Sequence, residues 1–164
     1  MMKTILIFVL LYGIFTIELF ANSYLRDDQA NIVLDTTTNL MWQDTQAVQE
    51  VEKPWGEAIN YCEELVLGGY DDWRLPNSFE LNSIVDRTKF NPVLNDAFIY
   101  PNISINNVFW SSTSKYGYNA NAWPVEFTRG TFSGYYIKDD GNYSYLGTTK
   151  DTPHFIRCVR NVKK

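Results

Sequence analysis

One stretch of the sequence, GGYDDWRLPNSFEL at residues 68–81, gathers side chains that could do chemistry. Asp71 and Asp72 are adjacent, and Arg74 follows them after a single tryptophan. Two carboxylates beside a guanidinium can act as an acid–base cluster, hold a metal ion, or form an internal ion pair that supports the fold. The first two interpretations indicate an enzyme or a metal site and the third a scaffold, so this stretch bears directly on the class of protein.

The other reactive side chains are two cysteines, Cys62 and Cys158, and a single histidine, His154. In an exported chain, a lone pair of cysteines is most simply a disulfide. A reactive thiol would need His154 as its base, and a zinc site would need about four ligands at close spacing. We therefore expect a Cys62–Cys158 disulfide, with no metal site and no cofactor.

The N-terminal segment has the pattern of a secretory signal peptide. Lys3 gives a positive start, residues 4–17 are almost wholly apolar, and Ala21 supplies a small residue for cleavage. An uncleaved membrane anchor is the alternative, but the apolar run is shorter than the roughly 20 residues that a spanning helix needs. We expect residues 1–21 to be removed, leaving residues 22–164 as one secreted or periplasmic domain without membrane insertion.

The composition of the chain excludes one class of partner. The formal net charge is −5, and the sequence contains no basic run. Because nucleic-acid binding depends on neutralising phosphates with Lys and Arg, we expect no nucleic-acid partner. Aromatic residues make up 16% of the chain, enough to fill a core and also to line a recognition surface.

The first half of the chain predicts two strands and a helix. Residues 32–35 and 40–42 read as strands joined by a turn, in which Asn39 adopts the left-handed conformation. Residues 54–67 read as an amphipathic helix that ends at two glycines, with Cys62 on its buried face. The apolar stripe of that helix comprises Trp55, Ala58, Ile59, Cys62, Leu65 and Val66.

The second half predicts a short helix and then a sheet. Asn77 followed by Glu80 resembles a capping box, which begins the second helix. Residues 87–107 are rich in Asn and Pro, and we expect little regular structure there. The remaining runs alternate as strands, with a hairpin between the second and third: 108–112, 122–127, 131–136 and 154–160. In the last strand, Phe155 and Arg157 should face one side, and Ile156 and Cys158 the other.

Five blocks of sequence resemble a known family: DTTTNLMWQD, WGEAINYCEELVLGGYDDWRLPNSFEL, FWSSTS, AWPVEF and IRCVR. Their order and spacing resemble the C-terminal domain of the Legionella collagen-like adhesins, from about residue 32 to residue 160. That family is placed in the C-type lectin-like fold, so the resemblance implies an α+β domain with two helices, a largely antiparallel sheet and one disulfide. The Arg-Leu-Pro before a helix is also similar to formylglycine-generating enzymes and to retroelement-diversified variable proteins, which share that fold.

The resemblance also implies roles for individual residues. It implies a disulfide from the first helix to the last strand, which Cys62 and Cys158 can supply. Arg74 should be mostly buried and paired, because a buried arginine is costly without a partner. Asp71 and Asp72 are then either that partner or solvated turn residues. A structural role is expected for six residues: Trp73, Arg74, Leu75, Pro76, Trp110 and Trp123.

Departures from related patterns limit what the resemblance implies about function. Calcium-dependent sugar-binding lectins of this fold carry a Glu-Pro-Asn or Gln-Pro-Asp triplet and a Trp-Asn-Asp triplet, and neither occurs here. Trp123 is instead followed by Pro124 and Val125. The free cysteine pair that formylglycine generation requires is also missing. Similarity of fold alone supports neither calcium-dependent sugar binding nor oxidation.

The sequence therefore favours a recognition module that binds a glycan, or a protein of the envelope or of a host surface, without metal. Tyrosine offers large contact area and asparagine offers adaptable hydrogen bonds, a composition typical of recognition loops. The expected ligand-binding residues are Tyr116, Tyr118, Asn119, Asn121, Tyr135, Tyr136, Tyr143 and Tyr145. The alternatives are a structural envelope subunit and an enzyme of the formylglycine-generating type; we expect no enzymatic activity, since no nucleophile, base and metal set converges.

Overall fold

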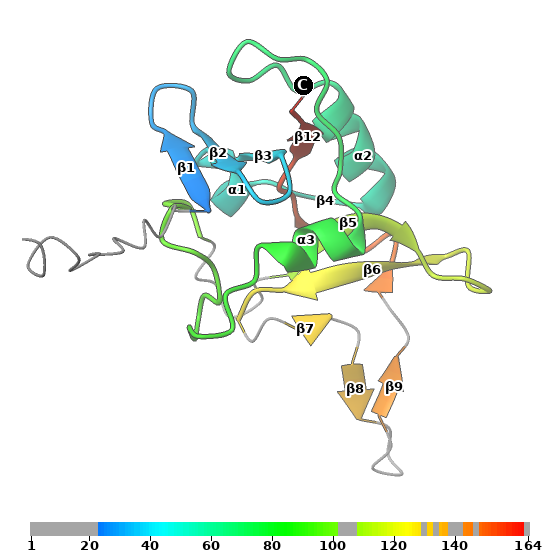
Figure 1. The fold of residues 1–164 in the computed structure, drawn as a ribbon. Helices are drawn as coiled ribbons and strands as arrows, with labels where there is room; N and C mark the ends of the chain where they lie inside the picture. Colours follow the sequence, from blue (N-terminus) through cyan, green and yellow to red (C-terminus); the bar gives the residue numbers. More distant parts are fainter. Residues whose placement is uncertain are drawn as a thin grey trace, which may run out of the picture.

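The computed structural model describes residues 23–101, 108–128, 131–132, 135–137, 143–145 and 148–162 (Figure 1). For residues 131–145 it describes only the backbone of the strands. The predicted signal peptide at residues 1–21 lies outside these ranges, so it and the domain boundaries stay predictions. None of the described helices is long and apolar enough to cross a membrane.

The first sheet has four strands in the order β1-β2-β3-β12, and each neighbouring pair is antiparallel. It confirms the predicted strand pair, and Asn39 in the turn between them has a φ of 56°. The strand β1 was not predicted, because its four residues, YLRD, show little apolar alternation. The bounds are Tyr24–Asp27 for β1, Ile32–Asp35 for β2, Leu40–Gln43 for β3 and Val159–Asn161 for β12.

The second sheet follows the order β10-β6-β5-β11-β4, and β7 pairs with β6 in the predicted hairpin. Its pairs are antiparallel except β11 with β5, which run parallel. A separate two-stranded sheet joins β8 to β9. The bounds are Glu52–Lys53 (β4), Val108–Ser114 (β5), Asn121–Glu126 (β6), Thr131–Phe132 (β7), Tyr135–Ile137 (β8), Tyr143–Tyr145 (β9), Thr148–Thr149 (β10) and His154–Phe155 (β11).

The described residues contain three helices rather than the predicted two: α1 (Ala47–Glu50), α2 (Trp55–Glu63) and α3 (Ser78–Ser83). The prediction missed α1, a single turn too short to show a helical period. It also made α2 too long. The N–H of Leu65 bonds to the carbonyl of Cys62, which tightens the chain, and Val66 is 73% exposed instead of joining the apolar stripe.

The predicted capping box of α3 is confirmed in both directions. The side chain of Asn77 accepts a hydrogen bond from the N–H of Glu80 at 2.9 Å, and the Glu80 carboxylate accepts one from the N–H of Asn77 at 2.8 Å. These two bonds satisfy backbone donors that the first turn of a helix leaves unpaired. The sequence signature therefore predicts the residue at which this helix begins.

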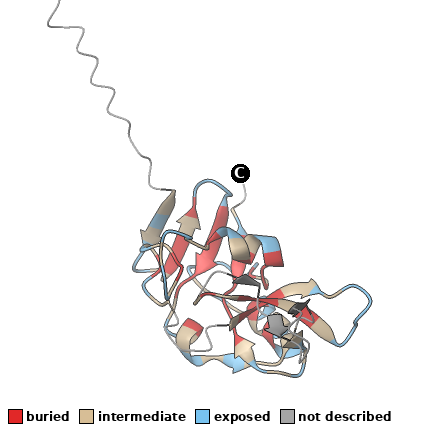
Figure 2. Cartoon of the chain, turned by 90° about the horizontal axis from the view of Figure 1, so that it is seen from below, coloured by how far each residue is buried: buried red, intermediate tan, exposed pale blue. Residues whose placement is uncertain are grey.

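The first sheet separates two hydrophobic cores. Val33 and Trp42 face one core together with Phe109 and Phe127, whereas Ile32 and Met41 face the other. The predicted last strand at residues 154–160 is two short strands, β11 and β12, in different sheets. Its side chains divide between the cores as predicted: Phe155 belongs to the first core, and Ile156 and Cys158 belong to the second. In Figure 2 the buried residues, coloured red, lie mostly along the central strands of the domain.

The predicted disulfide is present between Cys62 of α2 and Cys158, with the two Cα atoms 5.5 Å apart. Both cysteines are fully buried in the second core. The bond ties α2 to the residue just before β12, the strand that closes the first sheet, across a sequence separation of 96 residues. It therefore links the helix layer to the sheet by a covalent bond.

A buried ion pair lies on the opposite side of the first sheet, and the sequence analysis did not anticipate it. Arg157 donates to Oδ1 of Asp44 at 2.8 Å, and both side chains are at most 1% exposed. Asp44 also accepts hydrogen bonds from Arg26 and from the N–H of Ile99. Burial lowers the pKa of Arg157 from its ordinary value, whereas the carboxylate of Asp44 acts to raise it.

We expect the disulfide to contribute strongly to stability. Replacing both cysteines by serine should lower the free energy of unfolding by about 2–5 kcal/mol, because the unfolded chain is no longer constrained. Urea denaturation of the two proteins measures this difference. Reducing agent should lower the urea midpoint of the unmodified protein but not that of the serine variant. An equal shift in both would contradict the assignment of this stability to the disulfide.

We also expect Asp44→Ala to destabilise the protein by about 3–5 kcal/mol, because it leaves the guanidinium of Arg157 buried without its partner. The matched control is Asp28→Ala, which removes an 82% exposed carboxylate that contacts Arg26. An exposed pair contributes about 0–1 kcal/mol, so the control should unfold almost like the unmodified protein. Equal losses of stability from the two substitutions would show that the buried Asp44 pair contributes no more to stability than an exposed one.

Candidate functional site

Arg74, in the stretch at residues 68–81 that suggested chemistry, forms its contacts with other elements of the fold. Arg74 donates to both oxygens of Glu80, at 2.7 Å each, and to Oδ1 of Asn161 at 2.8 Å. The backbone of Arg74 pairs with Val159 of β12. Burial alone would raise the pKa of Glu80, but hydrogen bonds from Arg74 and from the N–H of Asn77 hold that pKa below its ordinary value. Arg74 thus anchors the start of α3 to the first sheet.

Arg74 is paired as predicted, and its burial is partial, with 38% of the side chain exposed. The reason is geometric: its partner Glu80 lies at the start of α3, where the carboxylate is itself 20% exposed. Its neighbours Trp73, Leu75 and Pro76 are buried, as predicted. The backbone carbonyls of the preceding loop accept hydrogen bonds from the Trp73 indole, which fixes that loop to the core.

The two aspartates have separate environments. Asp72 forms an ion pair with Arg160 of β12, with distances of 2.6 and 3.2 Å, and the guanidinium lies 3.7 Å from the ring centroid of Tyr70. Asp71 is exposed. These residues line a shallow hollow of about 340 Å³, but its one buried guanidinium is already paired. The arrangement supports the scaffold interpretation over an acid–base site.

His154 was the one candidate base in the sequence. Its ring lies 4.5 Å from the centroid of Trp110, and Nε2 is buried without a hydrogen-bond partner. Burial lowers the pKa of His154 from 6.5 to about 4. A neutral imidazole packed on a fully buried tryptophan has the environment of a core residue. Within the described part of the chain, no group of three or more His, Cys, Asp and Glu side chains is placed to hold a metal ion.

The predicted recognition residues of the first group lie on the connection between β5 and β6. Tyr116 is 100% exposed and Tyr118 is 55% exposed. Three backbone hydrogen bonds close this connection, among them one from the N–H of Asn121 to the carbonyl of Tyr118 at 2.9 Å. Gly117 takes a φ of 75°, a conformation that other residues rarely adopt. The turn therefore carries its tyrosines beyond the end of the sheet, together with the exposed Asn119.

Two tryptophans and two lysines lie at this end of the second sheet, one pair on each face of the β5–β6 pair, and the sequence analysis did not place them there. The Lys115 Nζ lies 4.2 Å from the ring centroid of Tyr118 and 5.7 Å from that of Trp123. The Lys150 Nζ lies 3.9 Å from the ring centroid of Trp55 and 2.9 Å from Oγ of Ser114. We call this end of the second sheet the hairpin face. It comprises Lys115, Tyr116, Tyr118, Asn119, Asn121 and Trp123 and, on the other side of the β5–β6 pair, Trp55, Ser114 and Lys150.

The geometry of Trp55 explains how a residue of the predicted apolar stripe joins the hairpin face. Its N–H bonds to the carbonyl of Lys150 at 2.8 Å, and its indole Nε1 donates to the carbonyl of Ser111 at 2.8 Å. Trp55 is therefore fixed at the start of α2, against β5, and stays only partly buried. Trp123, expected to be structural, is likewise only partly buried. Helical spacing alone cannot show that the first residue of a stripe lies at the rim of a core.

The second group of predicted tyrosines lies on β8 and β9, where Tyr135 pairs with Tyr145, and Tyr143 with Ile137. Their backbones form an antiparallel pair, but their side chains and that of Tyr136 lie outside the described residues. In Figure 1 the β8–β9 pair lies below β7, whereas the connection from β5 to β6 extends from the end of the second sheet. Ligand binding by the second group stays a prediction.

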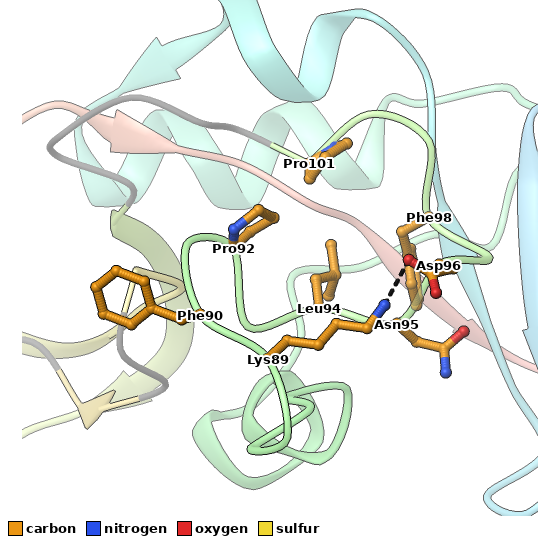
Figure 3. A pocket seen from close by; sticks show the side chains of 8 residues that line it. All are labelled: Lys89, Phe90, Pro92, Leu94, Asn95, Asp96, Phe98 and Pro101. Atoms are coloured by element: carbon orange, nitrogen blue, oxygen red, sulfur yellow. Dashed lines mark ion pairs between the residues drawn. The ribbon is translucent and has the colours of Figure 1, made fainter.

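A further hollow of about 420 Å³ lies in the irregular segment that follows α3 (Figure 3). Lys89 reaches Asp96 at 2.5 Å across one side of it, while the ring of Phe90 points away from the other labelled side chains. Phe98 at its base is buried, and its ring lies 4.9 Å from the guanidinium of Arg157. This hollow therefore sits over the buried ion pair, and its charged groups neutralise each other.

The environment of His154 predicts a dependence of stability on pH. Above pH 6.5 the imidazole is neutral in both states and contributes nothing; between about pH 6.5 and 4 the unfolded chain binds a proton that the folded protein excludes. Stability should therefore fall as the pH drops through this window, by about 1–3 kcal/mol for a half-buried ring.

His154→Phe should remove that part of the dependence, because phenylalanine keeps the ring contact with Trp110 and has no titrating group. Thermal denaturation from pH 7.5 down to 4 should show both proteins losing stability through the carboxylates that they share. The unmodified protein should lose more, so the difference in stability between the two should change as the pH falls below 6.5. A constant difference in stability across the range would show that His154 does not titrate as its burial indicates.

Comparison with known proteins identifies one family for this chain. No curated protein and no solved structure matches the chain. The model of one family, described as the Lcl C-terminal domain, matches residues 31–160. That range begins just before β2 and ends within β12, so it includes the disulfide, the connection between β5 and β6 and the strands of both sheets except β1. The chain therefore belongs to the Lcl C-terminal domain family.

Proposed function

We propose that this protein is an exported, adhesin-like recognition module that binds a glycan through the hairpin face without a metal ion. The observation that carries the proposal is the grouping of the exposed Tyr116 and Tyr118 with Lys115 and the partly buried Trp123 at one end of the second sheet. Aromatic rings stack on the apolar faces of sugars, and their contact with a ligand removes apolar surface from water. The family membership supports an adhesin-like role for such a surface.

The polar groups of the hairpin face suit a ligand that is rich in hydroxyl groups. Lys115 and Lys150 can donate hydrogen bonds, and the amides of Asn119 and Asn121 can both donate and accept. The backbone hydrogen bonds between Lys115, Tyr118 and Asn121 close the turn before any ligand arrives. A site built on a closed turn between two strands loses less conformational entropy on binding than a flexible loop would.

The same observations favour a recognition module over an enzyme. The carboxylates of Glu80 and Asp72 are held by Arg74 and Arg160, and His154 is packed on Trp110. General acid–base chemistry needs such groups aimed into an accessible cleft. We therefore propose no catalytic role for the residues of the loop at 68–81 or for His154.

We further propose that the domain has the C-type lectin-like fold and acts outside the cytoplasm, secreted or in the periplasm. The two-sheet α+β arrangement and the Cys62–Cys158 disulfide support both points. Disulfides persist in oxidising compartments, and the predicted signal peptide supplies a route to one. A structural envelope subunit remains the second candidate, because the fully exposed ring of Tyr116 would equally suit a protein partner.

The proposal is tested by replacing Tyr116 and Tyr118 together with alanine and measuring binding on a glycan array. Binding should weaken by at least about 30-fold, since loss of a central aromatic contact typically costs 2 kcal/mol or more. The melting temperature should change little, because both rings are exposed. The matched control is Phe79→Ala, which removes an 80% exposed ring on α3 and should leave glycan binding intact.

The two candidate functions give different results in this experiment. Glycan binding that survives the double substitution would contradict the hairpin face as the site. No glycan binding by the unmodified protein, together with capture of an envelope protein that the double substitution abolishes, would favour the structural subunit. A large loss of stability would show the two tyrosines to be part of the core.

A further inference from the structure

The strand β1 forms one outer edge of the first sheet, and the described part of the chain places no strand beyond it (Figures 1 and 2). The carbonyl of Ser23 accepts from the N–H of Thr36, and the register with β2 continues through Leu25 opposite Leu34. In an antiparallel pair the hydrogen-bonded positions alternate. The N–H and C=O groups of Leu25 therefore face β2, and those of Tyr24 and Arg26 point outward from the sheet.

An apolar row leads across the sheet to this edge. Leu25 lies opposite Leu34, which lies opposite Met41, and cross-strand partners share one face of a sheet. Met41 is buried at 8% exposure, Leu34 is intermediate, and Leu25 at the edge is 52% exposed. The row thus runs from the second core to the unpaired edge and ends in an uncovered leucine.

We propose that β1 pairs with β1 of a second copy of this chain, antiparallel, about a twofold axis that passes through Leu25. The outward backbone groups then match: Tyr24 of each copy pairs with Arg26 of the other, which makes four backbone hydrogen bonds in all. Leu25 meets Leu25 of the second copy at a non-hydrogen-bonded position, where side chains approach most closely. The apolar row becomes continuous across both copies, from Met41 of one to Met41 of the other.

The side chains of β1 fit this register without repulsion. Asp27 lies opposite Ser23, and Arg26 lies opposite Tyr24, so no two like charges face each other across the axis. The carboxylate of Asp27 already accepts from the N–H groups of Gln29 and Ala30, which holds it in the turn after β1. Proteins commonly protect a free edge with lysine, proline or a bulge. β1 contains none of these three, although it is short and carries charge at Arg26 and Asp27, two further features that limit pairing at an edge.

A second copy fits this edge better than an unrelated strand, because the register matches itself in both charge and apolar surface. The strand is short, so the contact is smaller than the roughly 1,600 Å² of a stable interface, and we expect association in the micromolar range or weaker. The pairing goes beyond the proposed glycan binding and does not depend on it. It would present two hairpin faces on one particle, which strengthens attachment to a repetitive surface.

The first experiment uses Leu25→Cys in the full chain, purified from the exported fraction. At a non-hydrogen-bonded position the two Cα atoms would lie about 4.5 Å apart, within the range that a disulfide accepts. We expect covalent dimers under mild oxidation, seen by non-reducing electrophoresis. The matched control is Val66→Cys, an equally simple change at a 73% exposed apolar residue that is not part of β1. Equal cross-linking of the two variants would overturn the proposal.

The second experiment measures association of the unmodified protein by sedimentation equilibrium. Leu25→Lys would place two ammonium groups together on the axis and should raise the dimer dissociation constant at least tenfold, while Val66→Lys should leave it unchanged. An unmodified protein that stays monomeric at millimolar concentration would refute the pairing, as would a dimer that Leu25→Lys does not weaken. If Leu25→Lys fails to fold, the cross-linking comparison decides.

Discussion

The carboxylate of Asp44 joins the irregular segment after α3 to the first sheet. It accepts from Arg157 before β12, from Arg26 of β1, and from the backbone N–H groups of Ile99 and Tyr100. The irregular segment after α3 contains no helix or strand up to residue 101, so its end at Ile99 and Tyr100 is held by single contacts such as these. A fully buried carboxylate can carry this role only because charged and backbone donors compensate for its lost hydration.

The chain between β11 and β12 shows how this ion pair and the disulfide act together. Arg157 points to the ion cluster on one side of the first sheet, and Cys158 points to the helix α2 on the other. Two neighbouring residues therefore fix the same short segment from both faces. Because the closing strand is held in this way, its backbone can pair with both β3 and Arg74, which positions α3 in turn.

The sequence could predict the features that depend on local pattern. The capping box at Asn77, the left-handed Asn39, the strands before and after it and the single cysteine pair all follow from residue type and short spacing. It could not predict Arg26, Asp44 and Arg157 as partners, since they lie 18 and 113 residues apart. A charged residue in a polar run looks the same whether it is solvated or buried, and only the packing of distant segments decides.

The residues of the candidate site likewise include some that local sequence predicts and some that it does not. Tyr116 and Tyr118 were found because a turn rich in tyrosine has no structural need for so many rings. Trp55 and Lys150 were not, because they reach the hairpin face from a helix start and a strand end far away in the sequence. The loop with Asp71, Asp72 and Arg74 has the stronger chemical pattern, yet its ion pairs are used to join α3 and β12. Charged groups that are already paired inside the fold form few further contacts with a ligand. Exposed rings on a closed turn still have most of their surface free for contact.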